Sequence, residues 1–444
     1  MFSWNNFTIF IIVSFLKKNI MARKPETIFV QIASYRDPDL LNTLKDILDK
    51  AKSPQNLRFG IAWQHHKDDE WDKLDDYIDD DRFRILDIPS EESRGACWAR
   101  NLLQQLYEGE KYTLQIDSHT RFIKNWDLEL KKEYKRLLKT GIEKPLLTSY
   151  APSFEPDNDP KQRVDKPWRM DFDRFSPDGN VHFLPSTIDD FKDRSEPIPA
   201  RFYSAHFAFA DGKFVDEVPH DPEYYFHGEE ISIAVRAYTH GYELLHPHKI
   251  FLWHYYTRRG LKKHWDDHND WGGINDGSHR RNRKLFGMDG EVYEPEFFGK
   301  YGLGTKRTLD EYERYAGISF SRRAVQQHTL DKKDAPCPVF ENEEEYQNSF
   351  STPFKHCIDI SFDSVPHDDY NVWAVAFEDE SGNEIYRDDA GADEIKRMMT
   401  DPDRFCRLWR SFNTVSRPYK WIVWPHSEKE GWVNRMEGVL YEKA

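Results

Sequence analysis

Short apolar runs alternate with stretches of helical periodicity between residues 27 and 152, and this alternation constrains the fold more than any other feature. Amphipathic helices are expected after Pro38, after Ser93 and over residues 126–138. Strands that alternate with helices at this spacing predict a mostly parallel α/β sheet. Ligands bind beyond the carboxyl ends of such strands, so the polar residues there are the first candidates for a site. The expected strands are 28–33, 57–63, 83–88, 112–116 and 144–150.

Two long segments lack this periodicity. Residues 153–200 are rich in Pro and Asp, and residues 256–300 are rich in Gly, Arg, Lys, His and Trp. Long segments without a repeating apolar pattern are typical of functional loops, so we expect loops at both places. Between them, a helix is expected over residues 231–240, where Gly241 can end it, and a strand over residues 250–255.

The C-terminal part of the chain has a different pattern. Beyond residue 335, strand-like runs are separated by turn signals such as the one at residues 380–384, which predicts a mainly β domain of sandwich type. We expect its core to contain the tryptophans of this region, in preference to their stacking on sugars: Trp373, Trp421, Trp424 and Trp432. The predicted parts are a tail or weak anchor at 1–26, an α/β domain at 27–335 and a β-sandwich-like domain at 340–444.

Composition narrows the class of protein. Of 444 residues, 38% are hydrophobic and 15% aromatic, which is enough for packed cores in two domains. A formal net charge of -15 argues against a nucleic-acid-binding protein, because such proteins need a basic face for the phosphates. The cysteines form no CxxC pair, so reduced thiols in the cytosol are the simplest explanation. They are Cys97, Cys337, Cys357 and Cys406.

Residues 7–16 form an apolar run followed by Lys17 and Lys18. A helix that spans a bilayer takes about 20 residues, and the run also lacks the leader and cleavage site of a signal peptide. We therefore expect a cytoplasmic protein without stable membrane insertion. Membrane association through residues 7–16, or translation from Met21, are the alternatives. The sequence makes no prediction of oligomeric state.

Asp117 and His119 follow the fourth predicted strand. They lie two residues apart in Gln115-Ile-Asp-Ser-His119, so both side chains lie on the same side of an extended chain. A divalent cation such as Mn²⁺ accepts carboxylate oxygen and imidazole nitrogen and keeps open positions for phosphate oxygens. A turn-capping aspartate and a surface histidine would explain the bare pattern more simply. The position after a strand of the α/β pattern favours the metal site.

Glu229 and Glu230 follow His227-Gly228 at the start of a predicted helix. Acidic residues are common there because the helix dipole favours them, but a preceding glycine also lets the backbone approach a ligand closely. The structural and the functional explanation have equal weight on this pattern. In the functional one, one carboxylate binds sugar hydroxyls and the other faces the acceptor.

His254 lies among aromatic residues at the end of a predicted strand, where a lone histidine is more often part of the core. Two ligands would leave most positions of a six-coordinate cation to phosphates and water, so His254 is a candidate third ligand. His246 and His248 are competitors, but they lie in a Pro-containing turn and are expected at the surface.

Basic residues provide candidates for phosphate binding. Arg94 and Arg100 flank the start of the helix after Ser93, where a helix N-terminus favours anions, with surface salt bridges as the alternative. A basic segment after His254 could close over a diphosphate or could be a solvated face. It contains Arg258, Arg259, Lys262 and Lys263 and, further on, Arg280, Arg281 and Arg283.

Five separated segments resemble the glycosyltransferase family that includes the Skp1-type protein hydroxyproline α-N-acetylglucosaminyltransferases. The similarity covers roughly residues 27–320, and the segments occur in the family order. They are IFVQIASYRDPDL (28–40), SRGACWARNLLQQLY (93–107), YTLQIDSHTRF (112–122), FHGEEISIAVRAYTHGYEL (226–244) and YGLGTKRTLDEYERYAGI (301–318).

The resemblance implies a GT-A fold related to the polypeptide GalNAc-transferases, which share a DxH motif, and a smaller C-terminal domain outside the matching part. It implies UDP-GlcNAc as the donor, Mn²⁺ or Mg²⁺ as the metal, and retention of the anomeric configuration. It places the metal at Asp117, His119 and His254, and the catalytic or acceptor contacts at Glu229 and Glu230. Donor contacts would come from Ala33, Ser34, Tyr35, Arg36, Asp37, Arg94, Arg100, Gln115, Asp117 and Ser118.

The predicted function is transfer of N-acetylglucosamine to a hydroxyl of a protein, such as hydroxyproline, Ser or Thr. The nearest alternative is the same chemistry on a glycan or lipid-linked acceptor in surface polysaccharide synthesis. A non-catalytic sugar-binding protein is a third possibility, but the intact Asp117, His119 and Glu229-Glu230 argue against it. A metal-dependent hydrolase would be expected to gather more His and Asp ligands.

Overall fold

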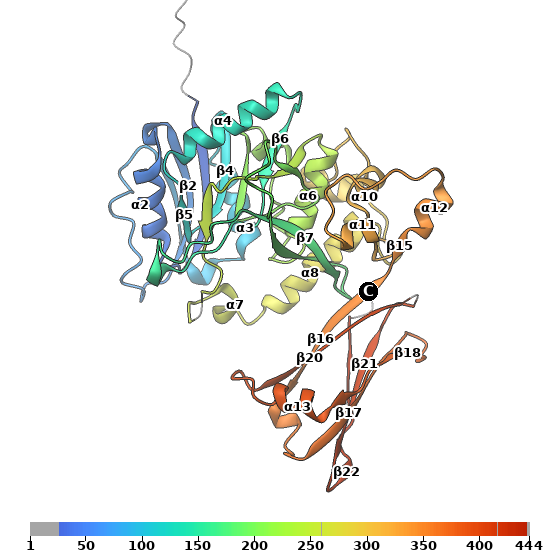
Figure 1. Ribbon diagram of the computed structural model, residues 1–444. Helices are drawn as coiled ribbons and strands as arrows, with labels where there is room; N and C mark the ends of the chain where they lie inside the picture. Colours follow the sequence, from blue (N-terminus) through green and yellow to red (C-terminus); the bar gives the residue numbers. More distant parts are fainter. Residues whose placement is uncertain (1–25, 259, 415, 442–444) are drawn as a thin grey trace, which may run out of the picture.

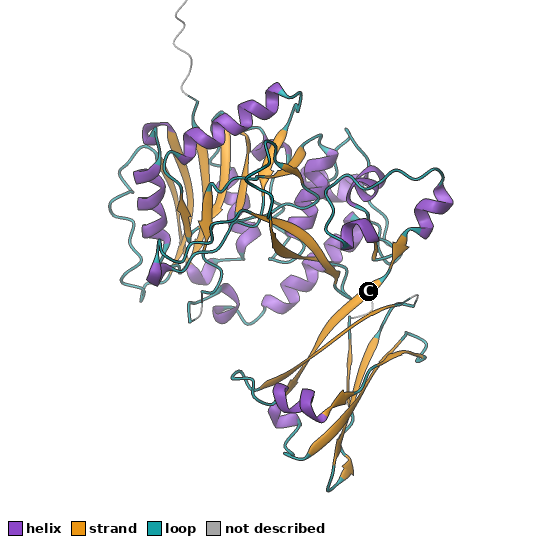
Figure 2. Ribbon diagram, in the orientation of Figure 1, coloured by secondary structure: helices purple, strands orange, loops and turns teal. Residues whose placement is uncertain are grey.

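The larger part of the molecule is an α/β region, and a smaller region built mostly of strands lies beside it (Figure 1, Figure 2). The computed structural model describes residues 26–258, 260–414 and 416–441. The predicted tail or anchor, with its apolar run at 7–16, thus lies outside the described residues apart from Glu26. None of the described helices is long and apolar enough to cross a membrane.

An eight-stranded mixed sheet forms the centre of the α/β region, in the order β3-β2-β1-β4-β10-β6-β11-β9. Strands β1 to β4 run parallel, whereas β10 is antiparallel to both its neighbours. The predicted α/β sheet is therefore confirmed. The strands are β1 Ile28–Tyr35, β2 Leu57–His65, β3 Phe83–Pro89, β4 Tyr112–Asp117, β6 Pro145–Thr148, β9 Ile198–Pro199, β10 Phe207–Asp211 and β11 Glu243–His246.

Helices bury the apolar residues of this sheet. Ile28, Val30 and Ile32 of β1 are fully buried, and α2 turns Leu40 and Leu44 into the same core. Helix α3 packs on β1 and β2, and α4 packs on β6. Burial of these apolar faces, which the periodicity of the sequence predicts, stabilises the fold. The helices are α2 Leu40–Lys50, α3 Ala96–Gln104, α4 Trp126–Lys139, α5 Phe214–Glu217 and α6 Glu229–Thr239.

The strand order reverses between β1 and β4. The chain adds β2 and β3 on one side of β1 and places β4 on the other, with Ala33 opposite Asp117 in the parallel register. Such a reversal leaves a crevice beyond the carboxyl ends of the two strands, which is where open α/β sheets bind ligands. The residues at the end of β1 and those at the end of β4, including Asp117, therefore face the same crevice.

A short two-stranded sheet lies next to this crevice. Strand β5 (Thr120–Phe122) pairs with β12 (Leu252–His254) in antiparallel register, with His254 opposite Thr120. The pairing joins segments that are more than 100 residues apart in the sequence, and it carries His254 to the side of His119.

The two segments predicted to be loops contain regular structure. Residues 153–200 include a hairpin, β7 (Trp168–Phe175) and β8 (Val181–Thr187). Apolar residues of β7 alternate with charged ones, and the charged ones find partners elsewhere, such as Asp173, which pairs with Lys355 at 2.7 Å. The prediction of a long loop was wrong because these partners come from distant parts of the chain.

Residues 256–300 are also largely helical, with α8 spanning Trp271–Leu285. This helix contains Gly272, Gly273 and Gly277, which lower the intrinsic helix propensity, so the sequence did not indicate it. Tertiary packing compensates through the buried side chains of Ser278 and Leu285. The other helices of the α/β region are α7 His264–Asp267, α9 Pro295–Phe298, α10 Leu309–Ala316, α11 Gln327–Leu330 and α12 Glu343–Asn348.

The smaller region is a sandwich of two sheets around one apolar core. Strands β16 and β20 continue the sheet of the β7–β8 hairpin in the order β20-β16-β7-β8, and β17 and β21 form the centre of the second sheet. The predicted mainly β character of the C-terminal part is thus confirmed. The elements are β16 Pro353–Ser361, β17 Tyr370–Glu378, β18 Glu384–Arg387, β19 Ala390–Gly391, α13 Ala392–Met398, β20 Phe405–Asn413, β21 Lys420–Ser427, β22 Gly431–Trp432 and β23 Met436–Val439.

The tryptophans of the smaller region do not all lie in its core. Trp373 is fully buried, and Trp421 packs against the core, as predicted. Trp424 and Trp432 are 39% and 46% exposed, so for them the prediction was wrong. Their rings lie 5.0 Å apart on the outer side of the second sheet, where they contact each other.

A three-stranded sheet lies just before the start of the smaller region. Strand β15 (Phe350–Ser351) pairs with β14 (Ala324–Gln326), which pairs with β13 (Ile318–Ser319). Residues just before β16 thus pack with the α/β region. We propose Thr352 as the boundary between the regions, in place of the predicted boundary at 335–340.

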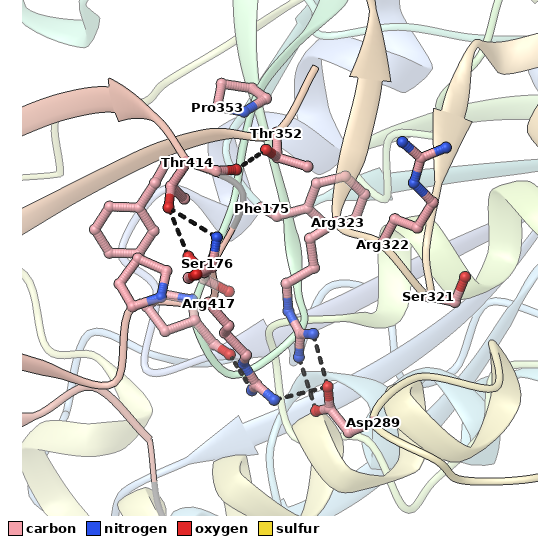
Figure 3. Close-up of a pocket in the computed structure, with 14 residues that line it drawn as sticks. Phe175, Ser176, Asp289, Ser321, Arg322, Arg323, Thr352, Pro353, Thr414 and Arg417 are labelled. Atoms are coloured by element: carbon pink, nitrogen blue, oxygen red, sulfur yellow. Dashed lines mark hydrogen bonds and ion pairs between the residues drawn. The ribbon is translucent and has the colours of Figure 1, made fainter. Parts of the chain in front are cut away.

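Ion pairs also join the two regions. Arg417 of the smaller region pairs with Asp289 of the α/β region at 2.7 Å, and Arg323 of the α/β region binds the same carboxylate at 2.7 Å (Figure 3). Arg417 also donates to the backbone carbonyl of Pro177 in the β7–β8 turn. The small cavity around these residues shares no lining residue with the cavities at the end of β4.

Candidate active site at the end of strand β4

Three side chains that can bind a metal ion converge beyond the end of β4. Oxygen and nitrogen atoms of Asp117, His119 and His254 lie within 4.8 Å of one another. The Asp117 Oδ2 atom lies 3.2 Å from His254 Nε2 and 3.8 Å from His119 Nε2. One carboxylate and two imidazoles are a donor set that suits Mn²⁺ and related cations. The structure thus brings together the three residues predicted as metal ligands.

Asp37 binds the ring nitrogen of His119 that faces away from Asp117. The His119 Nδ1–H donates to Asp37 Oδ2 at 2.7 Å, and the Ser118 hydroxyl donates to the same oxygen at 2.5 Å. This leaves His119 Nε2 free to face Asp117, an arrangement in which a carboxylate fixes the orientation of a metal-binding histidine. Burial opposes the charge on Asp37, but His119 and Arg258 outweigh it and hold its pKa well below the usual range.

Arg100 ties the Asp117 carboxylate to a second acid. Its guanidinium donates to Asp117 Oδ1 at 2.9 Å and to Glu229 Oε1 at 2.7 Å. Burial alone would raise the pKa of Asp117, but the hydrogen bond from His254 and the charge of Arg100 hold the pKa well below its usual range. Asp117 is therefore ionised, which is the form that binds a cation.

His254 is buried and has one unpartnered nitrogen. Its Nε2 faces Asp117, and its Nδ1 has no hydrogen-bond partner among the described residues. The His206 ring lies against it, with ring centroids 4.3 Å apart. Burial lowers the pKa of His254 to about 4, so the ring is neutral near pH 7 and can act as a metal ligand.

The two competing histidines do not reach this cluster. His246 and His248 are 1% and 3% exposed, so the expectation that they lie at the surface was wrong. His246 is bound through both ring nitrogens, to the Thr148 carbonyl and the Met170 N–H. It serves the core because β11 runs through the central sheet.

Glu229 and Glu230 have different surroundings although they are neighbours in α6. Glu229 is 4% exposed and is occupied by Arg100 and by the Cys97 thiol. Glu230 accepts hydrogen bonds from the Ala205 N–H at 2.9 Å and the Tyr150 hydroxyl at 3.3 Å. Burial, with no cation in contact, raises the pKa of Glu230 to about 8. Glu229 thus holds Arg100, whereas Glu230 is a largely protonated carboxyl at the wall of a cavity.

Two cavities meet at this cluster, and both are lined by Arg100, Asp117, Phe226, His254 and Tyr256. We call the first the basic cavity. Its volume is about 270 Å³, and its own lining includes Ala33, Tyr35, Gly95, Ser118, His119, Arg258, Lys262 and Lys263. We call the second the aromatic cavity. Its volume is about 680 Å³, and its own lining includes Tyr150, Glu155, Trp168, His182, Phe183 and Glu230.

The start of α3 forms part of the basic cavity. The helix begins at Ala96 after Gly95, not directly after Ser93 as predicted. Gly95 has φ +103°, and a Cβ atom there would lie 2.6 Å from the Tyr225 ring, so only glycine fits. The helix N-terminus therefore comes close to the cavity, where its N–H groups favour an anion.

Not all of the predicted donor-binding residues line these cavities. Ala33, Tyr35, Arg100, Asp117 and Ser118 do. Four others are buried or bound to other protein groups, and one is exposed. Ser34 and Asp37 are 1% exposed, Arg36 pairs with Asp69 and Asp267, Gln115 binds the Ala205 carbonyl and His220, and Arg94 is exposed over the Trp98 ring.

Sequence reasoning also missed residues of the site. No local pattern in the sequence distinguishes His206 or Tyr150 as a residue of a site. Trp168 and Phe183 belong to the unpredicted hairpin, whose alternating apolar residues were the available signal. Arg258, Lys262 and Lys263 of the predicted basic segment do line the basic cavity, whereas Arg259 lies outside the described residues.

Residues 27–79 and 72–322 match the model of a family described as Glycosyltransferase (GlcNAc). The match spans more than half of the chain, so the chain belongs to this family of glycosyltransferases. No curated protein matches it. The resemblance seen in the sequence is thus confirmed at the level of the family, without the hydroxyproline-specific group.

Solved structures with some similarity include GalNAc-T7 with UDP, GalNAc and Mn²⁺, at 15% identity and a TM-score of 0.40, over 53% of this chain and 44% of that chain. S. aureus TarS 1–349 shows 13% identity and a TM-score of 0.34, over 52% and 60%. The mannosyltransferase PcManGT from Pyrobaculum calidifontis, with GDP-Man and Mn²⁺, shows 10% identity and a TM-score of 0.35, over 56% and 66%. These values are low, so the assignment to the family rests on residues 27–322.

Proposed function

We propose that the chain transfers a sugar from a nucleotide-sugar donor, with a divalent cation bound by Asp117, His119 and His254. The observation that carries the proposal is the convergence of these three residues at the strand-order reversal, beside a basic cavity. Family membership and the DxH pattern favour UDP-GlcNAc as the donor and Mn²⁺ or Mg²⁺ as the metal. The GT-A fold is the corresponding proposal for the α/β region.

The basic cavity has the chemistry of a diphosphate site. Arg258, Lys262 and Lys263 supply positive charge on one side, and the N-terminus of α3 supplies N–H groups on the other. A cation at Asp117 would neutralise the charge that develops on the leaving diphosphate. Ala33 and Tyr35 are then positioned to contact the nucleoside.

The side chains of the site position the reactants. Asp37 orients His119, and Arg100 fixes the Asp117 carboxylate, so the ligands need little rearrangement when the cation binds. The aromatic cavity opens directly beside Asp117 and can hold the acceptor hydroxyl close to the donor. Retention of configuration, by attack from the same face as the leaving phosphate, belongs to this proposal because the family resemblance supports it.

The acceptor has two candidate classes. The resemblance to the hydroxyproline-modifying enzymes supports a hydroxyl of a protein, on hydroxyproline, Ser or Thr. The aromatic lining of the second cavity supports a glycan or lipid-linked glycan. A cytoplasmic location also remains part of the proposal, and the four cysteines are free, as expected there.

Release of UDP from UDP-GlcNAc, with and without Mn²⁺, tests the proposed function. We expect slow release that requires the cation and that falls to background in Asp117→Ala. UDP-GalNAc, UDP-glucose and GDP-mannose serve as competing donors. A protein that binds UDP-GlcNAc but releases no UDP would be a sugar-binding protein, and metal-dependent release from sugar substrates without a nucleotide would indicate a hydrolase.

A further inference from the structure

We propose that the acceptor is an uncharged saccharide, bound in the aromatic cavity by its ring faces and its hydroxyl groups. The inference rests on the proposed function and extends it to the second substrate. Three observations support it: aromatic side chains line the cavity, Arg100 in its lining is already paired with two carboxylates, and the strand at its wall contains a proline.

Five Trp, Tyr and Phe side chains are among the described residues that line this cavity. Trp168 and Tyr256 lie at an angle of 36° with ring centroids 5.8 Å apart, and Phe183 lies on the strand paired with that of Trp168. Tyr256 and Phe226 are 39% and 45% exposed. Large aromatic side chains that stay exposed at a cavity offer flat apolar surface to a ligand, and the C–H faces of a pyranose ring match such surfaces.

The described residues that line this cavity offer no free positive charge to an anionic acceptor. Among the described residues that line it, Arg100 is the only Arg or Lys, and both Glu229 and Asp117 occupy its guanidinium. A polymer that carries phosphate groups would need unpaired Arg or Lys side chains. The basic residues are instead gathered in the other cavity, where the proposed function requires them.

The polar groups that remain suit hydroxyl groups. Glu155 is bound only by the Thr257 hydroxyl, at 2.8 Å, and Glu230 only by the Ala205 N–H and the Tyr150 hydroxyl, among contacts of the described residues. Carboxyl oxygens can accept from sugar hydroxyls, and a protonated Glu230 can also donate to one. An aromatic pocket with a few such groups is typical of small polar ligands that need orientation.

The wall strand does not favour a peptide. Strand β8 is the outer strand of the sheet β20-β16-β7-β8, and an extended peptide would add to its free edge. Pro185, in the middle of β8, lines the cavity and has no N–H to offer. A saccharide needs no backbone pairing, so the same proline does not hinder it.

In the transfer step, a hydroxyl oxygen of the acceptor bonds to the anomeric carbon of the donor sugar. The bond from that carbon to the diphosphate oxygen breaks, and the hydroxyl proton passes to the departing diphosphate. The step is balanced without any further reactant.

An acceptor screen with the full chain, UDP-GlcNAc and Mn²⁺ tests the inference. Neutral oligosaccharides, peptides containing hydroxyproline, Ser or Thr, and a ribitol-phosphate polymer are compared for stimulation of UDP release and for a glycosylated product. We expect stimulation by a neutral saccharide. For Trp168→Ala we expect the KM for that saccharide to rise by about tenfold, a typical effect of one aromatic contact, with the KM for UDP-GlcNAc and acceptor-independent UDP release unchanged.

Trp432→Ala is the matched control, because Trp432 is an exposed tryptophan on the outer face of the smaller region. Phe183→Ala, at a position that lines the aromatic cavity and not the basic one, repeats the test in case Trp168→Ala does not fold. Stimulation by the peptides or the phosphate polymer, and not by saccharides, would overturn the inference while leaving the proposed function intact. Absence of UDP release from every donor would overturn both.

Discussion

The two cavities that meet at Asp117 share five lining residues but differ in the charge and the aromatic character of the rest of their lining. The basic cavity gathers Arg258, Lys262 and Lys263 around the ends of β1 and α3. The aromatic cavity gathers rings from the β7–β8 hairpin and from the ends of β6 and β12, and Arg100, the one arginine among its described lining residues, is paired with two carboxylates. The shared residues thus lie between a cavity that suits anions and a cavity that suits uncharged rings. Variants on either side should therefore change the use of one substrate only.

Asp117→Ala should have the largest effect, because Asp117 belongs to both cavities. Loss of a ligand to the cation should reduce transfer by ~10³-fold or more, since a Lewis acid contributes several kcal/mol and each tenfold in rate corresponds to about 1.4 kcal/mol. Steady-state UDP release and calorimetric titration of Mn²⁺-dependent UDP binding measure it. The melting temperature should stay close to that of the wild type, as for the exposed control Asp68→Ala. Near-normal activity would show that the metal is not bound here.

Asp37→Asn should weaken the metal site without touching either cavity. The amide cannot hold the His119 ring as the carboxylate does, and loss of such a partner typically costs about 10- to 100-fold in metal affinity. Activity measured against Mn²⁺ concentration should shift by this factor and recover at saturating Mn²⁺. An unchanged Mn²⁺ dependence would mean that His119 needs no such support.

Exchanging Lys262 and Lys263 for Gln should affect only the basic side. We expect the KM for UDP-GlcNAc to rise by about 3- to 10-fold, in line with the loss of charge-assisted contacts that are partly open to solvent. The effect should shrink as salt is added, because salt screens exposed charges. Lys355→Gln, which removes a lysine at the junction of the two regions, provides the control. A rise in the KM for the acceptor instead would break the division between the cavities.

Glu230→Gln should produce the smallest effect, visible in stability rather than in donor binding. The pKa of Glu230 is raised to about 8 from an ordinary 4.5, so its contribution to stability is present below pH 4.5 and is lost as the pH rises through 8. Glutamine does not titrate, so the variant should gain stability relative to the wild type between these values. Denaturant unfolding at about pH 5 and about pH 8 measures the difference. A difference that is the same at both pH values would show that Glu230 is ionised throughout.

Local sequence patterns were sufficient where one element decided the outcome. The apolar periodicity of β1, α2 and β4 predicted a buried parallel sheet, and the position of Asp117 and His119 after β4 predicted a polar site, because the carboxyl ends of neighbouring strands face one crevice. The strand-like runs beyond residue 335 likewise predicted a β region, because apolar and polar residues alternate there with a period of two.

Tertiary structure decided the rest. The antiparallel pairing of β12 with β5 brings His254 to Asp117, and no local pattern distinguishes His254 from His246, which lies in the core instead. Asp37 was predicted to bind the donor but holds His119, since folding of the β1 turn buries it beside that ring. The hairpin that forms the aromatic cavity looked like a loop because its charged residues are paired with partners far away in the sequence. Such pairs form only between elements that the fold places side by side. The order of residues along the chain does not show which elements these are.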